Sequence, residues 1–313
     1  MIDITLIGTG ALQPLPQRAL ASAAITINGH ILLLDCGEGT QSVAKKADVS
    51  LMKIDAILLT HYHGDHTYGL PGLLQSIGMA GRTEPITIFG PAGLSENMKP
   101  FMMLCPYLPY ELRFMELTDE NGETAPMALK KLIPAMPDGF MLSHFKTEHR
   151  VPSIGYRFEL TRLGKFQPQK AKALGVPVNE WKRLQKGETV MVGENAVTPD
   201  QVMGEARKGL TVVYTGDTNA CESAVNGAKN ADLLIAEATY GENEQEETAN
   251  EHGHMTFSQA AQLAKDAGAG ELWLTHYSPM VDDPEAYREN AVGIFENAVC
   301  GQDGMKTTLR FEE

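Results

Sequence analysis

Several residue types are scarce in this chain of 313 residues, and each scarcity excludes a class of protein. The four cysteines form no Cys-x-x-Cys pair and show no pairing pattern, so we expect free thiols in a reducing compartment. No uninterrupted apolar stretch approaches the roughly 20 residues that cross a bilayer. The amino terminus runs into a Gly8-Thr9-Gly10 turn without the basic segment or cleavage site of a signal peptide. We therefore predict a cytoplasmic protein with no membrane role.

Positive charge is also scarce. The chain has 26 Lys and Arg residues against 40 Asp and Glu residues, a formal net charge of -14. As a whole-chain average, this balance argues against a polyanionic partner such as nucleic acid. Residues 161–186, however, contain seven basic residues and one acidic residue. The average therefore hides a basic window in an otherwise acidic chain.

Short apolar runs that alternate with turns and helical stretches indicate a mixed α/β fold. Hydrophobic residues make up 43% of the chain, enough to bury a sizeable core. We predict strands at residues 2–7, 23–27, 31–35, 54–60, 86–89, 210–214, 233–236, 272–275 and 307–311. We predict helices at residues 40–47, 70–79, 258–267 and 284–297. Asn28-Gly29, between two of these strands, is a hairpin signal.

The domain organisation follows from a change in composition. The segment 161–209 is rich in Lys, Gln, Gly and Pro and poor in large apolar residues, whereas the segments on both sides alternate strands and helices. We therefore predict one domain spanning residues 1–313, into which residues 161–209 are inserted.

The most informative segment is Leu59-Thr60-His61-Tyr62-His63-Gly64-Asp65-His66, at the end of the strand predicted at residues 54–60. Three imidazoles and a carboxylate within six residues are ligands that zinc takes. In an extended chain His61 and His63 point the same way, and Gly64 permits a bend that turns Asp65 and His66 toward a second centre. A dinuclear site needs further ligands from elsewhere in the chain.

Three further candidate ligands stand beside other predicted strands. Asp217 follows the strand at residues 210–214, and His276 follows the strand at residues 272–275. His149 lies in the run Glu148-His149-Arg150-Val151-Pro152-Ser153. Because loops at one end of a sheet converge on one site, we expect these three side chains to meet the histidine segment.

These residues resemble the metallo-β-lactamase superfamily and, within it, the ribonuclease Z branch. The H-x-H-x-D-H run with the later His, Asp and His indicates the superfamily. Flanking runs indicate the branch: Asp35-Cys36-Gly37-Glu38-Gly39-Thr40-Gln41, Gly69-Leu70-Pro71-Gly72-Leu73-Leu74, His149-Arg150-Val151-Pro152-Ser153 and Tyr214-Thr215-Gly216-Asp217-Thr218. The resemblance implies an α/β fold, the four-layer αββα metallo-β-lactamase sandwich, with an inserted flexible basic arm.

The resemblance also implies an activity, a zinc-dependent endoribonuclease that removes 3′ trailers from precursor tRNA by metal-hydroxide attack on the phosphodiester. It assigns His61, His63 and His149 to one zinc, Asp65, His66 and His276 to the other, and Asp217 to a bridge between them. Two Zn²⁺ ions per subunit are expected, although Mn²⁺ or another divalent ion suits the same ligands.

Further roles are implied for three residues near these ligands. Asp65 corresponds to the proton acceptor of the family. Glu237 and His254 match the pair that protonates the leaving group, and His252 is a neighbouring alternative to His254. Asp35, at the end of a buried strand, is expected to orient the metal loop and not to bind metal.

The inserted segment matches the arm with which the family grips tRNA. We expect a homodimer in which one subunit's arm holds the precursor tRNA cut by the other. Positive charge in the segment can neutralise tRNA phosphates. The candidate contacts are Lys165, Lys170, Lys172, Lys182, Arg183 and Lys186. Trp181 could stack on a base or anchor the arm. The chain also departs from the family after His276, where Tyr277-Ser278-Pro279-Met280 lacks an arginine that is common there.

Two other functions remain open at this stage. The same fold could cleave a small or cyclic phosphodiester, because the metal site would serve either substrate. A non-catalytic RNA-binding scaffold with a vestigial site is the third possibility, and the presence of all seven expected ligands argues against it.

Overall fold

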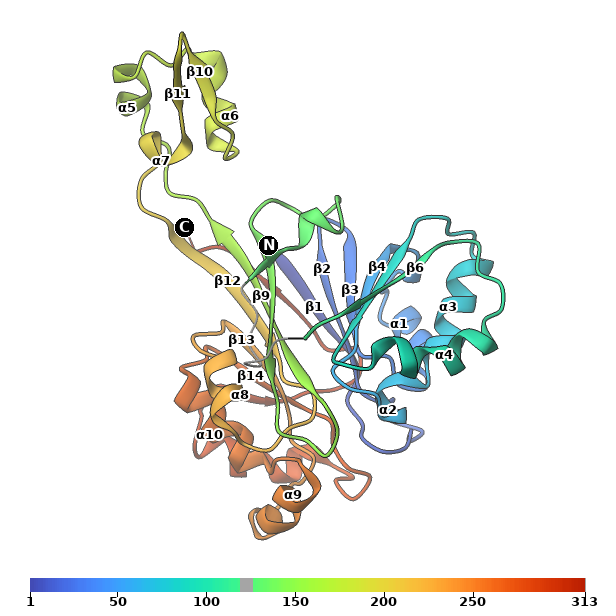
Figure 1. Ribbon diagram of the computed structural model, residues 1–313. Coiled ribbons are helices and arrows are strands. Elements are labelled where there is room, and N and C mark those ends of the chain that lie inside the picture. The colour runs from blue at the N-terminus through green and yellow to red at the C-terminus, as the bar shows by residue number, and fades with distance from the viewer. Residues whose placement is uncertain (119–125, 313) are drawn as a thin grey trace. The chain divides into compact units, whose positions relative to one another are not determined.

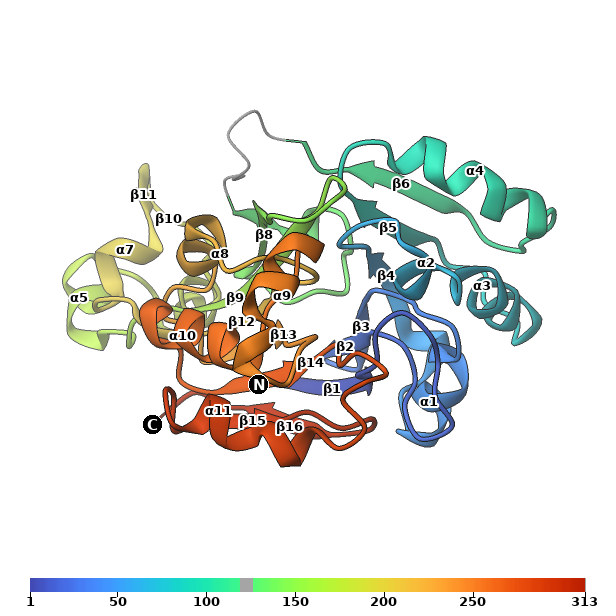
Figure 2. The same ribbon diagram turned by 90° about the horizontal axis from the view of Figure 1, so that it is seen from below.

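The computed structural model describes residues 1–118 and 126–312, and these form two compact units. The larger unit consists of residues 1–159 and 210–313, and the smaller unit of residues 160–209. The described part of the larger unit holds two mixed seven-stranded sheets, with helices on the outer side of each (Figure 1, Figure 2). The sandwich of two sheets between helices that the family resemblance implies is therefore confirmed.

The first sheet combines an antiparallel half with a parallel half. Its strands, in spatial order, are β16 (Lys306–Leu309), β1 (Ile2–Gly8), β2 (Ser22–Ile27), β3 (His30–Leu34), β4 (Ile54–Leu58), β5 (Ile86–Gly90) and β6 (Leu112–Glu116). Pairs from β16 to β3 are antiparallel, and pairs from β3 to β6 are parallel. Asn28 and Gly29 have φ values of 52° and 79° in the β2–β3 turn, as the hairpin signal requires.

Both faces of the central strands of this sheet are buried. Leu33 and Ile57 belong to an apolar cluster with helices α1 (Thr40–Lys46), α3 (Leu70–Met79) and α4 (Leu94–Leu104). Leu32 and Leu58, which point to the opposite face because side chains alternate along a strand, are also fully buried. The helices thus cover one face, and the other faces the second sheet (Figure 2).

The second sheet carries the later part of the chain. Its strands, in spatial order, are β15 (Ala298–Cys300), β14 (Leu272–Thr275), β13 (Leu233–Glu237), β12 (Arg207–Tyr214), β9 (Ile154–Arg162), β8 (Phe140–Lys146) and β7 (Met127–Ala128). The pairs from β12 to β15 are parallel. Helices α8 (Glu222–Gly227), α10 (Phe257–Ala267) and α11 (Arg288–Val292) pack against it through an apolar cluster rich in alanine.

One predicted helix differs from the structure. Instead of a continuous helix over residues 284–297, the chain forms a 3₁₀ turn, η5 (Pro284–Tyr287), followed by the short helix α11. Glycine favours a helix poorly, and the helix ends at Gly293. Ile294 and Phe295 still pack against the apolar cluster of the second sheet. The apolar spacing therefore identified buried residues correctly but overestimated the length of the helix.

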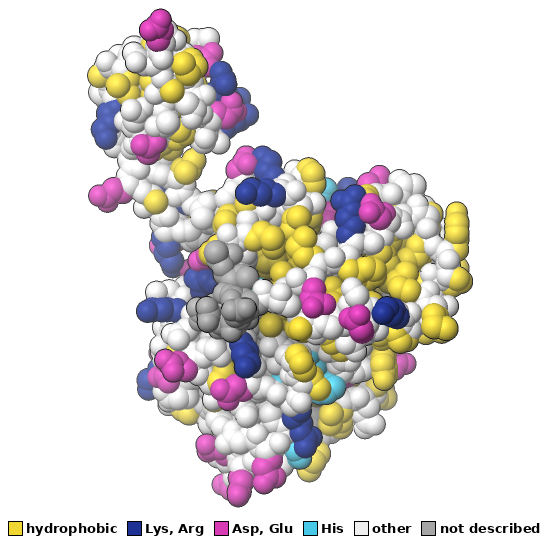
Figure 3. Space-filling view, in the orientation of Figure 1, with side chains coloured by type: hydrophobic (Ala, Val, Ile, Leu, Met, Phe, Trp, Pro, Cys, Tyr) yellow, Lys and Arg dark blue, Asp and Glu magenta, His cyan; other side chains and the backbone are white. Residues whose placement is uncertain are grey.

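The smaller unit has a hydrophobic cluster of its own. It contains α5 (Pro168–Ala173), α6 (Trp181–Gln185), the hairpin of β10 (Val190–Val192) and β11 (Asn195–Val197), and α7 (Pro199–Val202). Ala171, Leu184 and Val202 are fully buried in this cluster. Nine basic and five acidic residues lie within residues 160–209, and side chains of both signs are visible on the surface of the unit (Figure 3).

The remaining elements are short. They are η1 (Leu51–Lys53), α2 (Gly64–Thr67), η2 (Leu129–Lys131), η3 (Val178–Glu180), η4 (Asn243–Gln245) and α9 (Glu246–His252). The four cysteines are buried and free, as expected. No helix among the described residues has the length and apolar character needed to cross a membrane.

Candidate metal centre

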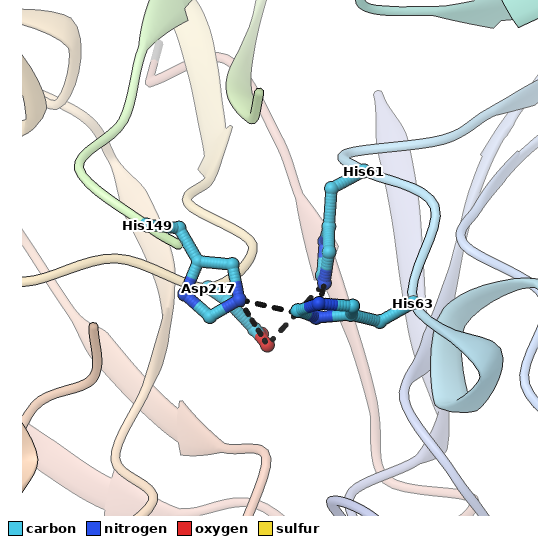
Figure 4. A group of neighbouring side chains, drawn as sticks. All are labelled: His61, His63, His149 and Asp217. Carbon is cyan, nitrogen blue, oxygen red and sulfur yellow. Dashed lines mark hydrogen bonds and ion pairs between the residues drawn. The ribbon is translucent and has the colours of Figure 1, made fainter. Parts of the chain in front are cut away.

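The predicted ligands meet at one edge of the larger unit, beyond the ends of several strands. The histidine segment follows β4, Asp217 follows β12, and His276 follows β14. His149 follows β8, which is separated from β12 by β9 in the second sheet. In Figure 4, His61 and His63 from one loop, and His149 and Asp217 from two others, reach toward a common point.

Three histidines and one aspartate form the first group. His63 Nδ1 lies 3.0 Å from His61 Nε2 and 3.2 Å from His149 Nε2. Asp217 Oδ2 lies 3.6 Å from His61 Nε2 and 3.9 Å from His149 Nε2. Each of these residues therefore turns one potential ligand atom toward the same small volume.

The second group lies on the other side of Asp217. His66 Nε2 and His276 Nε2 are 3.1 Å apart, and each lies 3.3 Å from Asp217 Oδ1. Asp65 Oδ2 lies 3.5 Å from His276 Nε2 and 3.9 Å from His66 Nε2. The two carboxylate oxygens of Asp217 thus face different groups, Oδ2 the first and Oδ1 the second.

The donor atoms of both groups fit divalent metal ions. A tetrahedral zinc site with bonds of about 2.0–2.1 Å has ligand-to-ligand edges of roughly 3.3 Å. Spacings of 3.0 to 3.9 Å between the nitrogen and oxygen atoms of these groups are close to that value. Imidazole and carboxylate donors suit zinc and several other divalent ions. The two groups are therefore consistent with a binuclear metal site.

Burial keeps the histidines of the first group neutral, which is the form that binds a metal ion. Burial lowers the pKa of His61, His63 and His149, and neighbouring imidazoles lower it further. Neutral imidazoles keep a lone pair on one ring nitrogen, and this lone pair is what a metal ion requires.

Charge is balanced differently in the second group. Burial opposes ionisation of Asp217, but the imidazoles of His276 and His66 outweigh burial and hold the pKa of Asp217 well below its usual range. Burial likewise opposes a charge on His66, but Asp217 and Asp35 raise the pKa of that imidazole well above its usual range. Asp217 and Asp35 thus favour a positive charge at His66, whether a proton or a metal ion supplies it.

Hydrogen bonds fix the orientation of the ring nitrogens that face away from the two groups. His66 Nδ1 lies 2.8 Å from Asp35 Oδ2, and His149 Nδ1 lies 2.8 Å from the Gly253 carbonyl oxygen. Asp35 also accepts hydrogen bonds from the Thr60 backbone and side chain. Asp35 therefore orients the metal loop from behind, as expected from the sequence.

Glu237 and His254 form a pair beside the second group. His254 Nδ1 lies 2.8 Å from Glu237 Oε1, and the two residues are 8% and 1% exposed. Burial alone would lower the pKa of His254, but Glu237 raises it to about 9. The ring of His254 stacks on that of His276 with centroids 5.4 Å apart. His252, the alternative considered from the sequence, bonds instead to the Tyr240 hydroxyl through Nδ1 at 2.7 Å.

Thr239 links this pair to the second group. Its hydroxyl donates to Glu237 Oε2 at 2.7 Å. A hydroxyl has one proton, so at the 2.9 Å contact with His276 Nδ1 it acts as the acceptor. His276 must then carry its proton on Nδ1, which leaves the lone pair of Nε2 directed at Asp217 and His66.

A cavity of about 750 Å³ opens onto both groups. Besides predicted ligands, it is lined by Tyr68, Arg150 and Tyr240, which sequence reasoning did not assign to the site. Leu12 also lines it, and its backbone N–H donates to Asp65 Oδ2 at 2.8 Å. Tyr68 and Arg150 lie within three residues of predicted ligands, a signal that could have identified them. Nothing in the sequence indicates the contact of Leu12.

The predicted substrate-binding residues lie in the smaller unit. Lys165, Lys170, Lys172, Lys182 and Lys186 are exposed there. Arg183 is exposed as well, but it forms ion pairs with Glu180 and Glu188 at 2.9 Å and 2.8 Å.

Trp181 has partners inside the smaller unit. Its indole N–H donates to the Val176 carbonyl oxygen at 3.0 Å, and its ring lies 5.3 Å from that of Phe166. Of the two roles considered for Trp181, these contacts favour an anchor of the unit.

Comparison with known proteins gives consistent matches over the whole chain. The family model of the beta-lactamase superfamily domain matches residues 30–277. The ribonuclease Z of Lachnospira eligens is 42% identical over 313 residues, which cover 100% of this chain and 99% of that protein. The ribonuclease Z of Lachnoclostridium phytofermentans is likewise 42% identical with the same coverage. The crystal structure of the short form of human tRNase Z superimposes with a TM-score of 0.67 at 26% identity, covering 99% of this chain and 100% of that one.

Proposed function

Because the chain belongs to the ribonuclease Z family of the metallo-β-lactamase superfamily, we propose that it is a metal-dependent endoribonuclease that removes 3′ trailers from precursor tRNA. One observation carries this proposal. Asp217 lies within 3.6 Å of a ligand atom in each of two His/Asp groups, and both groups lie beside a buried carboxylate–imidazole pair, Glu237 and His254. Phosphodiester hydrolysis needs both an activated water and an acid for the leaving oxygen, and this arrangement offers a place for each.

His61, His63 and His149 would hold the first ion, Asp65, His66 and His276 would hold the second, and Asp217 would offer one carboxylate oxygen to each. The spacing and chemistry of the donor atoms support this assignment. Two Zn²⁺ ions suit the donors, and Mn²⁺ or another divalent ion can bind a similar set. When bound, such ions lower the pKa of a water molecule and stabilise the charge that develops on the phosphoryl oxygens.

The chain's own residues handle the protons. Asp65 has a pKa held below its usual range by His276 and His66 against the opposing effect of burial, so its carboxylate is ionised. Its proposed role as the proton acceptor follows from the family resemblance. His254 carries its donor on Nε2, because Nδ1 is engaged by Glu237. We assign His254 Nε2 as the donor of the proton that the leaving 3′ oxygen takes. Glu237 keeps the ring of His254 oriented and charged.

The smaller unit is the proposed tRNA-binding arm. Its exposed lysines can neutralise phosphates, and this contribution is lost as salt rises. Acidic residues in the same unit reduce its net charge, so binding there depends on where the lysines lie and not on the average charge.

We further propose a homodimer that uses the outer surface of α3 and α4. Met79, Met103 and Tyr107 are 87%, 82% and 82% exposed on this surface, and Leu104 is 64% exposed. Yellow apolar side chains gather over this region in Figure 3. Large exposed apolar groups favour contact with a protein over contact with RNA, and a second copy is the partner that we assign. Sedimentation of the wild-type protein and of a Met103→Glu, Tyr107→Glu variant tests it: the variant should be monomeric.

Cleavage of a precursor tRNA with a 3′ trailer tests the proposed activity. We expect the purified, metal-loaded protein to release the trailer and leave a 3′-hydroxyl on the tRNA. Asp65→Ala and His254→Ala should each lower kcat by about 10²- to 10⁴-fold, the usual contribution of a proton-transferring group. His30→Ala is the matched control, because His30 pairs with Asp55 outside the metal centre.

The outcomes of this assay separate the candidate functions. An inactive protein that holds two metal ions per chain would overturn the proposal. Efficient hydrolysis of a cyclic nucleotide without cleavage of the precursor would identify a small-molecule phosphodiesterase instead. No activity together with well below two metal ions per chain would point to an RNA-binding scaffold.

A further inference from the structure

Aromatic side chains from two separate segments of the chain line the cavity that opens onto the candidate metal centre. We propose that they form a clamp for the two nucleotides joined by the scissile phosphodiester. Tyr240, backed by His252, stacks on the last nucleotide of the mature tRNA, and Tyr68 stacks on the first nucleotide of the trailer. The inference rests on the proposed function, because a substrate without bases would have no use for these surfaces.

Tyr240 and His252 form one wall of the cavity. The Tyr240 hydroxyl and His252 Nδ1 are 2.7 Å apart, and the two rings lie nearly parallel, at an interplanar angle of 27°. This hydrogen bond holds both rings in place before any substrate binds. Tyr240 is half-buried and also lies 6.4 Å, between ring centroids, from His254. A fixed, partly exposed aromatic surface thus adjoins the group that we assign as the acid.

Tyr68 comes directly after the ligand segment, two residues beyond His66. Its side chain is 67% exposed and lines the same cavity. The ring packs so closely on Gly64 that a Cβ at that position would lie 2.3 Å from ring atom Cε2. Gly64 separates His63 from Asp65, so the ring is fixed against the segment that carries ligands of both groups. Tyr68 also contacts Phe101 of α4, at 6.4 Å between ring centroids.

The chemistry of the reaction decides which nucleotide each side receives. Hydrolysis breaks the bond between phosphorus and the 3′ oxygen of the tRNA, and that oxygen takes a proton while water supplies the new oxygen on phosphorus. The 3′ oxygen must therefore approach His254, and its nucleotide lies beside Tyr240 and His252. The trailer nucleotide keeps the phosphate and lies on the other side of phosphorus, toward Asp65 and Tyr68.

Stacking also explains how the site can accept many precursors. Every base has an aromatic face, so stacking on tyrosine or histidine recognises a nucleotide without reading its identity. A family member that processes many tRNAs needs this tolerance next to the cut. A clamp of this kind also distinguishes RNA from a small phosphodiester that lacks bases.

Precursors with single abasic sites provide the test. Tyr240→Leu and Tyr68→Leu should each raise KM for an intact precursor on the order of 10-fold, the effect of losing one stacked base, with a smaller change in kcat. An abasic site at the last tRNA nucleotide should abolish the effect of Tyr240→Leu but not that of Tyr68→Leu. An abasic site at the first trailer nucleotide should show the reverse pattern. Tyr68→Phe keeps the ring and should keep the coupling.

This test distinguishes failure of the clamp from failure of the proposed activity. If the wild-type protein cleaves the precursor but each leucine variant loses the same factor on intact and abasic substrates, the clamp is wrong and the activity stands. If the two abasic sites couple to the opposite tyrosines, the direction of the substrate is wrong. A wild-type protein that cleaves no precursor contradicts the proposed function itself. Tyr68 is largely exposed, so its leucine variant tests the clamp even if Tyr240→Leu proves unstable.

Discussion

At the scale of single residues, two threonines determine which ring nitrogen carries the proton in two histidines of the candidate metal centre. Thr60 donates its hydroxyl proton to Asp35 and so accepts from His61 Nδ1, 3.1 Å away. Thr239 is placed in the same way between Glu237 and His276. In both cases a buried carboxylate sets the direction of the hydroxyl, and the hydroxyl sets which imidazole nitrogen keeps its lone pair. Neither threonine has to touch a metal ion to determine what the histidine can bind.

Replacement of Thr239 tests this argument. Thr239→Val keeps the shape of the side chain but leaves the Nδ1–H of His276 without an acceptor and Glu237 Oε2 without its closest donor. We expect the affinity for the second metal ion to fall by about 10- to 100-fold, the usual effect of losing such a partner. Calorimetric titration and elemental analysis of the apo protein measure it directly. Thr239→Ser retains the hydroxyl and should bind both ions like the wild type, and equal affinities for valine and serine variants would contradict the argument.

At the scale of elements, the ligands are positioned by strands that end at one edge and by tight backbone turns. Gly216, between β12 and Asp217, has a φ of +61°, and a Cβ there would lie 2.6 Å from Thr60 Cβ. Only glycine allows the turn after β12 to pass so close to the loop after β4. The close approach brings Asp217 to His61 and His66.

Gly216→Ala is therefore expected to destabilise the protein and displace Asp217. Overpacking costs roughly 1–3 kcal/mol, and a positive φ adds about 1–2 kcal/mol for an alanine. Gly29→Ala is the matched control, because Gly29 also has a positive φ, +79°, but no atom lies within 4 Å of a Cβ there. Denaturant unfolding should show a clearly larger loss of stability for Gly216→Ala. Only that variant should also bind fewer metal ions.

Features that depend on neighbouring residues could be predicted from the sequence, whereas features that depend on distant segments could not. Apolar runs predicted the strands that are almost fully buried, such as Ile54–Leu58. The exposed strand Leu112–Glu116 reads as no apolar run and was not predicted. The histidine segment could be predicted as a site because its ligands are adjacent in sequence. The contact of Leu12 with Asp65, across 53 residues, depends on a left-handed residue, Leu12 at φ 65°, which no local pattern requires. The prediction of a helix over residues 284–297 was wrong for a related reason. Its apolar residues are buried as expected, but the residues after Gly293 are held by packing against the apolar cluster and not by a helix.

At the scale of the whole molecule, metal binding should be a large part of the stability of the larger unit. The candidate ligands come from loops after four different strands, so ions at this edge would join segments from both sheets. The carboxylates of Asp65 and Asp217 each lie within 3.5 Å of His276 Nε2, so positive charge supplied by the ions would stabilise both.

Removal of metal should therefore lower the melting temperature. A ligand that binds only the folded state at about 1,000 times its Kd contributes about 4 kcal/mol. We expect scanning fluorimetry to show a drop of several degrees after chelation, and recovery after Zn²⁺ is added back. An Asp217→Ala variant supplies the control, because without the shared carboxylate its melting temperature should respond little to the chelator. An unchanged melting temperature of the wild-type protein would contradict a binuclear site that spans the two sheets.

The charge distribution leads to a prediction about tRNA binding, because a chain of net charge -14 must hold a polyanion through local contacts. Lys165, Lys170 and Lys172 are exposed and make no ion pair with any described residue, whereas Arg183 is already paired with two glutamates.

Counterion release makes affinity fall with salt in proportion to the phosphates neutralised, with a slope of roughly one per contact. Replacing the three lysines by glutamine should therefore weaken binding and flatten the plot of log Kd against log salt by up to about three. Arg183→Gln, which also removes one positive charge, should change the slope less than any single lysine replacement. A slope that depends only on the number of charges removed would mean that the smaller unit acts through its average charge and not through individual phosphate contacts.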